Sequence, residues 1–519
     1  MVDQGISVSN CSFSQILDVD LELRGGDPFR RYIIFTHILS VSNIRAFSST
    51  INRRATPSTP ARPFPGEYDA PKIVSAIPGP ESKKLSQELD KRQDTRTQHF
   101  FVDYKKSKGN YVVDADGNVM LDILCSIASH SIGYNAPALV EAARSEEWVT
   151  ALINRPATGV QPSTTWPGVI ENGIMSVAPK GLNQVFTAMC GSCANETAYK
   201  AVFMHHMRKV RGDAPYTQEE LQSCMKNEAP GAPNLSIMSF KGGFHGRLFG
   251  SLSTTRSKAL HKIDIPAFDW PQASFPALKY PLEQFEAENR KEEDRCLKEV
   301  EEVIEKNKGK VVGLIVEPIQ GEGGDNYATP YFFQKLRKIT KEHDVALIVD
   351  EVQTGVGATG KFWAHEHWDL DTPPDVVTFS KKMQAAGFYH SMDLRNFNTW
   401  LGDPIRALQA SVIIKEIKDN HLLENVQVTG EYLKNGLEKL RSKHTDLVSN
   451  VRGVGTFLAF DLPTPELQDK FLRILRQKGV EATGSGTRSI RFRPMLIFAP
   501  KHAQQFLDLA EEVLQQLKA

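Results

Sequence analysis

Two adjacent lysines, Lys381 and Lys382, follow an apolar stretch at 375–380 that is typical of a buried β-strand. Upstream, a second apolar stretch at 345–349 ends on Asp350. A lysine amine can form a Schiff base with an aldehyde, and a carboxylate can keep a pyridine nitrogen protonated. The pair therefore suits pyridoxal phosphate, which carries both groups. Two neighbouring lysines also fit a solvated loop, so this interpretation needs support from the rest of the chain.

Further candidates follow two other expected strands. Gly191 and Ser192 stand between a strand expected at 184–189 and a helix, where backbone N–H groups and a hydroxyl can bind a phosphate. Phe244 and Arg247 follow the strand expected at 236–240. An aromatic ring there can stack on a flat cofactor, and an arginine can bind a substrate carboxylate. The alternatives are an ordinary strand-to-helix turn, a packed phenylalanine and a surface arginine.

The elements that must position these residues alternate between strands and helices. This pattern predicts an α/β fold with a mostly parallel sheet and helices on its faces, followed by a smaller α+β C-terminal domain. Ligands bind such sheets at the carboxyl ends of the strands, where all these candidates lie. We further expect strands at 311–316, 346–349 and 376–379, a hairpin at 110–122, a charged helix at 283–310 and a small-residue turn at 385–387.

Composition limits the classes of partner. With 519 residues the chain should form more than one domain. Its 62 basic and 62 acidic residues give no reason to expect nucleic acid or an acidic membrane surface as a partner. Six cysteines do not indicate a disulfide scaffold, and no apolar run is long enough to span a membrane. We expect small-molecule substrates, no nucleic acid and no membrane.

The N-terminal part has a different composition. Residues 30–62 contain several arginines and many Ser and Thr, with no acidic residue before Glu67. This is typical of a mitochondrial transit peptide and predicts the mitochondrial matrix, although a disordered basic tail is the alternative. We predict an extension with this peptide at 1–65, an N-terminal segment with the large cofactor-binding domain at 66–400, and a small domain at 401–519.

Six segments together resemble the class III aminotransferases, which have the type I fold of pyridoxal phosphate enzymes, and in particular the members that act on 4-aminobutyrate. The resemblance covers 77–519 and implies a homodimer that transfers the amino group of 4-aminobutyrate to 2-oxoglutarate, giving succinate semialdehyde and glutamate. The alternatives are additional substrates such as 3-aminoisobutyrate or β-alanine, another ω-amine as the substrate, or a catalytically impaired homologue that acts as a binding partner. The segments are 190–196, 239–247, 316–325, 349–355, 361–368 and 397–403.

The resemblance also implies a role for each candidate. It assigns the Schiff base to Lys382, because three residues separate this lysine from the small pair Ala386-Gly387 as in the family. The resemblance further implies that Asp350 bonds to the pyridine nitrogen, that Gln353 contacts the phenolic oxygen and that Phe244 stacks on the ring. It implies that Gly191, Ser192 and Thr399 of the partner subunit bind the phosphate, and that Arg247 binds the carboxylate of 4-aminobutyrate. It also implies a pair between Glu322 and Arg491 that opens for glutamate or 2-oxoglutarate.

Cys190 and Cys193 form a CxxC motif. A [2Fe–2S] cluster takes four protein ligands, so two subunits could share one cluster. The resemblance implies such a cluster, and the alternative is a pair of inert thiols beside the phosphate site.

The chain departs from the family pattern at two places. Ala386-Gly387 stands where the family has paired glycines, and the segment 390–397 is shorter than expected. Because this segment leads to Thr399, phosphate binding across the dimer is in doubt. A genuine short loop and a mis-spliced gene model are both open.

Overall fold

The computed structural model describes residues 63–154, 157–393 and 396–518. The predicted transit peptide lies outside these residues. Residues 56–519 form one compact unit. No helix among the described residues is long and apolar enough to cross a membrane.

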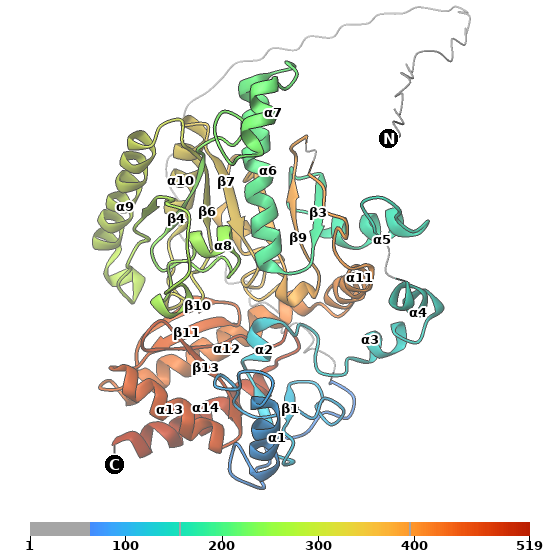
Figure 1. Ribbon diagram of the computed structural model, residues 1–519. Coiled ribbons are helices and arrows are strands. Elements are labelled where there is room, and N and C mark those ends of the chain that lie inside the picture. The colour runs from blue at the N-terminus through green and yellow to red at the C-terminus, as the bar shows by residue number, and fades with distance from the viewer. Residues whose placement is uncertain (1–62, 155–156, 394–395, 519) are drawn as a thin grey trace, which may run out of the picture. The chain divides into compact units, whose positions relative to one another are not determined.

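A seven-stranded sheet carries most of the candidate residues (Figure 1). Strands β8, β7, β6, β4 and β5 run parallel, whereas β9 is antiparallel to both β8 and β3. The α/β fold class predicted from the alternating pattern is therefore confirmed. In spatial order the strands are β3 Gln184–Ala188, β9 Ala386–His390, β8 Val376–Phe379, β7 Ala346–Asp350, β6 Val311–Val316, β4 Ser236–Phe240 and β5 Gln272–Ala273.

One expectation about this sheet was wrong. The small residues at 385–387 were expected to form a turn, but Ala386 and Gly387 lie inside β9. Their size serves packing: a Cβ at Gly387 would lie 2.3 Å from the carbonyl oxygen of Phe186 on β3. Sequence alone cannot distinguish a turn glycine from one required by a close neighbouring strand.

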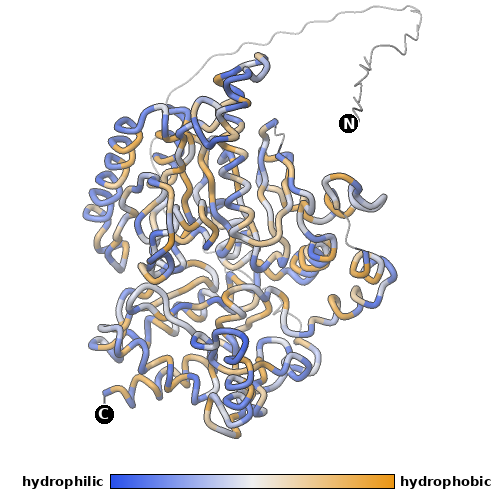
Figure 2. Tube along the Cα trace, in the orientation of Figure 1, coloured by the Kyte–Doolittle hydropathy of each residue, from blue (hydrophilic) through white to orange (hydrophobic). Residues whose placement is uncertain are grey.

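Both faces of the sheet are covered because successive side chains of each strand point to opposite sides. On β7, Leu347 and Val349 join the core beneath α9 (Glu286–Lys306) and α10 (Pro330–Glu342), whereas Ile348 packs with α6 (Gly191–Arg211). Figure 2 shows the hydrophobic colour gathered along the strands and the polar colour on the outer side of α9. The charged helix expected at 283–310 is thus confirmed as α9, and its charged side is exposed to solvent.

A second core unites the C-terminal part with an early segment. The hairpin expected at 110–122 is present as β1 and β2, and β12 pairs with β2 in parallel. Buried side chains of this hairpin pack with α12, α13, α14 and a four-stranded sheet. The elements are β1 Tyr111–Val113, β2 Val119–Asp122, α12 Leu422–Lys443, β10 Ser449–Val454, β11 Phe457–Asp461, α13 Pro465–Gln477, β12 Val480–Glu481, β13 Thr483–Ser485, β14 Ser489–Arg491 and α14 Pro500–Lys518.

Shorter elements connect these parts. The helices are α1 Pro80–Asp90, α2 Cys125–Ala128, α3 Pro137–Ala142, α4 Glu146–Ile153, α5 Trp166–Asn172, α7 Gln218–Cys224, α8 Phe249–Thr254 and α11 Pro404–Asp419. The 3-10 helices are η1 Ile174–Val177, η2 Ala259–His261, η3 Leu282–Gln284, η4 Ala364–Trp368 and η5 Lys381–Met383.

Two helical glycines provide a test of the packing. A Cβ at Gly430 on α12 would lie 2.1 Å from the carbonyl oxygen of Gly455, whereas one at Gly168 on α5 would meet nothing closer than 3.8 Å. We expect Gly430→Ala to lower the free energy of unfolding by about 1–3 kcal/mol through overpacking. Gly168→Ala should raise it by about 0.4–1 kcal/mol by restricting the unfolded chain. Urea denaturation measures both, and equal effects would contradict the close approach at Gly430.

Candidate active site

The candidate residues converge on one edge of the large sheet. Asp350 is the last residue of β7, Phe244 follows β4, Glu322 follows β6 and the two lysines follow β8. These strands are parallel, so their carboxyl ends meet at the same edge. The strand pattern thus brings together residues that are far apart in the sequence.

Asp350 is the most constrained of these residues. Its carboxylate is 4% exposed and accepts hydrogen bonds from the side-chain amide of Asn195 (2.9 Å) and the backbone N–H of Val352 (3.0 Å). His245 Nδ1 lies 2.8 Å from the same carboxylate. Burial of a carboxylate is expensive unless it is hydrogen-bonded or paired, and these partners meet that need. They also hold it in one orientation.

The start of α6 is the candidate phosphate site. Its first residue is Gly191, where a Cβ would lie 2.7 Å from Val352. Ser192 accepts a long hydrogen bond, 3.3 Å, from the backbone N–H of Arg247, and a Cβ at Gly246 would collide with its hydroxyl at 2.5 Å. The two glycines therefore let the helix start, with its free N–H groups, lie close to the loop after β4.

Glu322 and Arg491 form the ion pair that was expected. Arg491 Nη1 lies 2.6 Å from Glu322 Oε1, and Arg491 Nε is buried without a hydrogen-bond partner among the described residues. Although burial opposes it, the charge and hydrogen bond of Arg491 lower the pKa of Glu322 to about 2. Arg491 lies on β14, so this pair joins the four-stranded sheet to the large sheet.

The two lysines have different surroundings. Lys382 is buried, and its Nζ donates to the carbonyl oxygens of Pro494 (2.8 Å), His130 (3.4 Å) and Arg493 (3.5 Å). Burial lowers its pKa to about 8, and the charges next in effect are those of Cys125 and Arg493.

Lys381 has different electrostatic neighbours. Burial lowers its pKa to about 8 as well, but the charges that act on it next are those of Glu322, Arg491, Arg493 and Asp350. Its backbone is left-handed with φ of 30°, an uncommon conformation for lysine.

The loop after β4 places an aromatic ring beside an arginine. Arg247 is exposed and its guanidinium lies 5.5 Å from the centre of the Phe244 ring. The ring also lies edge-on to His261 at 5.3 Å. Within the part of the chain that the structure describes, no carboxylate is close enough to form an ion pair with Arg247, so its charge is free to bind an anion.

Sequence reasoning missed several partners at the site. Asn195 lies one helical turn after Gly191, and His245 adjoins Phe244; a helix-spacing argument could have found the first, but nothing marked the second. Glu317 is buried, and its carboxyl accepts from the backbone N–H groups of Phe244 (2.8 Å) and Gly321 (3.0 Å). Burial and the nearby Asp350 charge raise its pKa well above the usual value.

A second buried ion pair holds Gln353. Arg493 Nη2 lies 2.5 Å from Asp325, its Nε donates to Gln353 Oε1 at 2.8 Å, and its guanidinium stacks 3.5 Å from the Phe457 ring centre. Gln353 was expected at the cofactor, and this contact places it next to the 491–494 segment. The resemblance singled out Arg491, but no sequence feature pointed to a second buried ion pair at Arg493.

Thr399 and the two cysteines lie at the surface. Thr399 is exposed, as a residue that reaches a partner subunit would be, and Leu394 and Arg395 in the short loop before it lie outside the described residues. Cys190 and Cys193 have their sulfur atoms 3.5 Å apart at the start of α6. No group of three or more potential metal ligands occurs in the part of the chain that is described.

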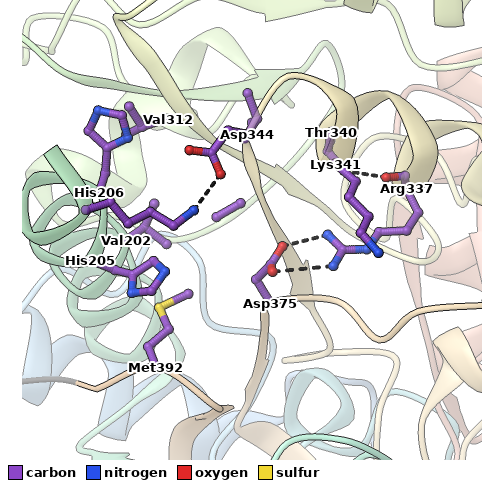
Figure 3. A pocket seen from close by; sticks show the side chains of 13 residues that line it. Val202, His205, His206, Val312, Arg337, Thr340, Lys341, Asp344, Asp375 and Met392 are labelled. Carbon is purple, nitrogen blue, oxygen red and sulfur yellow. Dashed lines mark hydrogen bonds and ion pairs between the residues drawn. The ribbon is translucent and has the colours of Figure 1, made fainter.

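A pocket of about 140 Å³ lies at the opposite edge of the sheet, at the amino ends of β6 and β7 (Figure 3). Four of its charged side chains form two ion pairs, Lys209 with Asp344 at 2.5 Å and Arg337 with Asp375 at 2.6 Å. None of the candidate residues lines it, and we assign it no role.

Comparison with known proteins agrees with this geometry. Residues 92–514 match the model of the family described as aminotransferase class-III. The chain is 61% identical to 4-aminobutyrate aminotransferase of Dictyostelium discoideum over 91% of this chain and 96% of that protein. It is 50% identical to the mitochondrial 4-aminobutyrate aminotransferase of Sus scrofa, covering 87% and 92%. The solved lysine aminotransferase of M. tuberculosis is 29% identical with a TM-score of 0.73, covering 84% and 98%.

Proposed function

Because the chain belongs to the class III aminotransferases, which are pyridoxal phosphate enzymes, we propose that it transfers the amino group of 4-aminobutyrate to 2-oxoglutarate. The products are succinate semialdehyde and glutamate. The observation that carries this proposal is the Glu322–Arg491 pair, together with the exposed Arg247, since they offer one site to two substrates with different numbers of carboxylates.

The residues at the sheet edge fit pyridoxal phosphate. When bound, the cofactor supplies an aldehyde for the amine and a pyridine ring that accepts electrons from the substrate carbon. Asp350 supplies a fixed, buried carboxylate for the pyridine nitrogen, and Phe244 a ring face for stacking. Gly191 and Ser192 offer N–H groups and a hydroxyl to the phosphate. Gln353 is proposed beside the phenolic oxygen, since Arg493 keeps its amide oxygen occupied and leaves the amide N–H groups to donate.

Of the two lysines, we propose that Lys381 binds the cofactor aldehyde. Motif spacing predicted Lys382, but the amine of Lys382 is engaged with three carbonyl oxygens on the far side of the segment. Lys381 has Glu322, Arg491 and Asp350 as electrostatic neighbours. A pKa of about 8 leaves an appreciable fraction of this amine neutral near pH 7, as nucleophilic attack and proton transfer at the substrate carbon require.

The ion pair has a physical role in substrate exchange. The carbon that bears the amino group of 4-aminobutyrate carries no carboxylate, so Arg491 would be an unpaired buried charge without Glu322. Glutamate supplies a carboxylate of its own at that position and can take the place of Glu322. Arg247 binds the distal carboxylate that both substrates share. A single site thus serves two substrates without leaving a charge unpaired.

We propose a homodimer whose interface includes Thr399. Phe397, two residues before Thr399, is an apolar side chain that is 55% exposed, and Leu152 and Ile153 at the end of α4 are 72% and 74% exposed. The 158–160 segment packs against 397–401. Burial of these exposed side chains against a second copy is proposed to bring Thr399 to the phosphate of the partner subunit.

For localisation we propose the mitochondrial matrix. The support is the arginine-rich, acid-free composition of 30–62 and the mitochondrial names of the mammalian relatives.

The function can be tested on the purified protein. We expect it to be yellow with bound cofactor and to lose this absorbance when 4-aminobutyrate is added. 2-Oxoglutarate should then restore the colour and yield glutamate. If the absorbance does not change with 4-aminobutyrate but does change with lysine or another ω-amine, the protein has a different substrate. No cofactor at all would show an inactive homologue.

Borohydride reduction identifies the cofactor lysine. We expect the reduced phosphopyridoxyl group on Lys381, because the charges of Glu322 and Asp350 act on its amine, whereas the Lys382 amine is hydrogen-bonded to backbone carbonyl oxygens. Peptide mass spectrometry distinguishes Lys381 from its neighbour, and a label on Lys382 would support the spacing argument instead. Lys381→Ala should reduce single-turnover transamination to background.

The ion pair predicts opposite losses in the two half-reactions. Glu322→Ala should slow the 4-aminobutyrate half-reaction most, because an unpaired buried Arg491 costs about 3–5 kcal/mol, or hundreds-fold if expressed in the transition state. The glutamate half-reaction should be less affected, and Arg491→Ala should show the reverse bias. Single-turnover rates measure each half. Arg247→Ala is the control, since it should damage both, and equal losses for Glu322→Ala would indicate a general structural role.

The iron–sulfur hypothesis stays a prediction. If two subunits share a [2Fe–2S] cluster through Cys190 and Cys193, anaerobically purified dimer should contain about two irons and two acid-labile sulfides. Cys193→Ser should lose both, whereas Cys224→Ser, which changes another exposed thiol, should keep them. Iron-free wild-type protein with full activity would leave the two thiols without a metal role.

A further inference from the structure

A short segment near the proposed cofactor lysine forms a left-handed helical turn. The four residues of α2, Cys125–Ala128, all have positive φ, at 52°, 49°, 57° and 63°. None of them is glycine. Left-handed conformation costs L-residues roughly 1–2 kcal/mol each and normally occurs at single positions. A whole left-handed turn persists only if its surroundings hold it in place.

One set of contacts holds the beginning of this turn. The carboxylate of Asp122 accepts from the backbone N–H groups of Leu124 (2.9 Å) and Cys125 (2.8 Å). Its second oxygen accepts from the hydroxyl of Tyr134 at 2.7 Å. Asp122 is itself fixed in β2, so the start of the turn is attached to the second core.

The end of the turn is held by the segment that follows Lys381. Lys382 Nζ donates to the carbonyl oxygen of His130 at 3.4 Å, and Gln384 Nε2 donates to that of Ser129 at 3.1 Å. Gln384 is also left-handed, with φ of 53°. Both donors therefore reach across from the segment that follows Lys381 to the carbonyl oxygens of the two residues directly after the turn.

Lys382 also reaches a third segment. Its shortest hydrogen bond, 2.8 Å, is to the carbonyl oxygen of Pro494, and it lies 3.5 Å from that of Arg493. These residues follow Arg491, which pairs with Glu322. Backbone bonds from Arg493 N to Ile123 O (2.8 Å) and from Leu496 N to Ser131 O (2.7 Å) already tie this segment to the flanks of the turn.

We propose that Lys382 is a positioning residue. Its buried amine holds the left-handed turn and the segment after β14 against the backbone that carries Lys381. The proposal rests on the proposed aminotransferase function and on Lys381 as the cofactor lysine. Three segments meet at this one amine, two of which carry candidate site residues, and no apolar side chain of similar length could satisfy their carbonyl oxygens. Loss of the amine would let the turn relax and shift Lys381 relative to Arg491.

The main experiment compares Lys382→Met with the wild-type protein, both as full chains loaded with pyridoxal phosphate. Hydrogen exchange of the backbone amides at 128–130 should become faster, on the order of tenfold, because the turn loses a charged donor. Borohydride should still place its label on Lys381. The rate of single-turnover transamination should fall about ten- to a hundredfold, as expected for a misplaced reacting group.

Two further variants make the result specific. Lys418→Met is the matched control, because this exposed lysine also donates to a carbonyl oxygen, that of Ser176 at 3.3 Å, far along the chain from the turn. It should leave exchange at 128–130 unchanged. Gln384→Leu leaves Lys382 in place but removes the hydrogen bond to Ser129, together with the one that Gln384 accepts from Gln409. It should speed exchange at the same amides with the label still on Lys381. It provides the test if Lys382→Met does not fold.

Each outcome bears on a different statement. The proposal is overturned if the amides at 128–130 exchange as slowly in Lys382→Met as in the wild-type protein. If only Gln384→Leu folds, the same result in that variant overturns it. Loss of the borohydride label in Lys382→Met, with the label on Lys382 in wild type, also overturns it and makes Lys382 the cofactor lysine. If the wild-type protein does not transaminate 4-aminobutyrate, the proposed function fails, while the exchange measurement still decides whether Lys382 holds the turn.

Discussion

The buried carboxylate of Asp350, at the end of the central strand of the large sheet, is the constraint on which the rest of the site depends. A charge in this position is tolerated only when donors surround it. Asn195 brings the start of α6 to it, and His245 brings the loop after β4. The proposed phosphate site and the proposed stacking ring are therefore placed by the same requirement: to satisfy one carboxylate inside a low-dielectric interior.

Charge pairing extends the same principle outward. Glu322 with Arg491, and Asp325 with Arg493, connect the loop after β6 to β14 and the residues that follow it. Each buried arginine needs a carboxylate, and each carboxylate lies on the other side of the contact. The two parts of the chain therefore cannot separate without leaving unpaired buried charges. A pair that can exchange one partner for a substrate carboxylate is, by the same logic, suited to select substrates.

Part of the backbone strain lies close to these charges. Left-handed residues other than glycine there include the turn Cys125–Ala128, Asp325, Lys381 and Gln384. Such conformations persist where surrounding hydrogen bonds outweigh their cost. Around the proposed cofactor lysine, the donors of Lys382 and Gln384 and the acceptor Asp122 supply those bonds. Polar groups that take no part in the proposed chemistry thus set the geometry of those that do.

The sequence by itself determined the order of strands and helices and most of the site. Apolar strands ending on Asp350 or on the lysine pair, and the glycines at 191 and 246, are local signals, because strand periodicity and turn chemistry act over a few residues. The hairpin at 110–122 was predictable for the same reason. Its place in a core with α12–α14 was not, since that contact joins residues hundreds of positions apart.

Only the tertiary structure distinguishes the surroundings of two equal neighbours. Lys381 and Lys382 are identical in type and adjacent in sequence. The Lys382 amine donates to the carbonyl oxygen of Pro494, whereas the charges that act on Lys381 include those of Glu322 and Asp350. The turn expected at 385–387 became part of β9 because β3 lies against it. Side-chain direction and strand pairing depend on the packed surroundings, and residue order does not contain them.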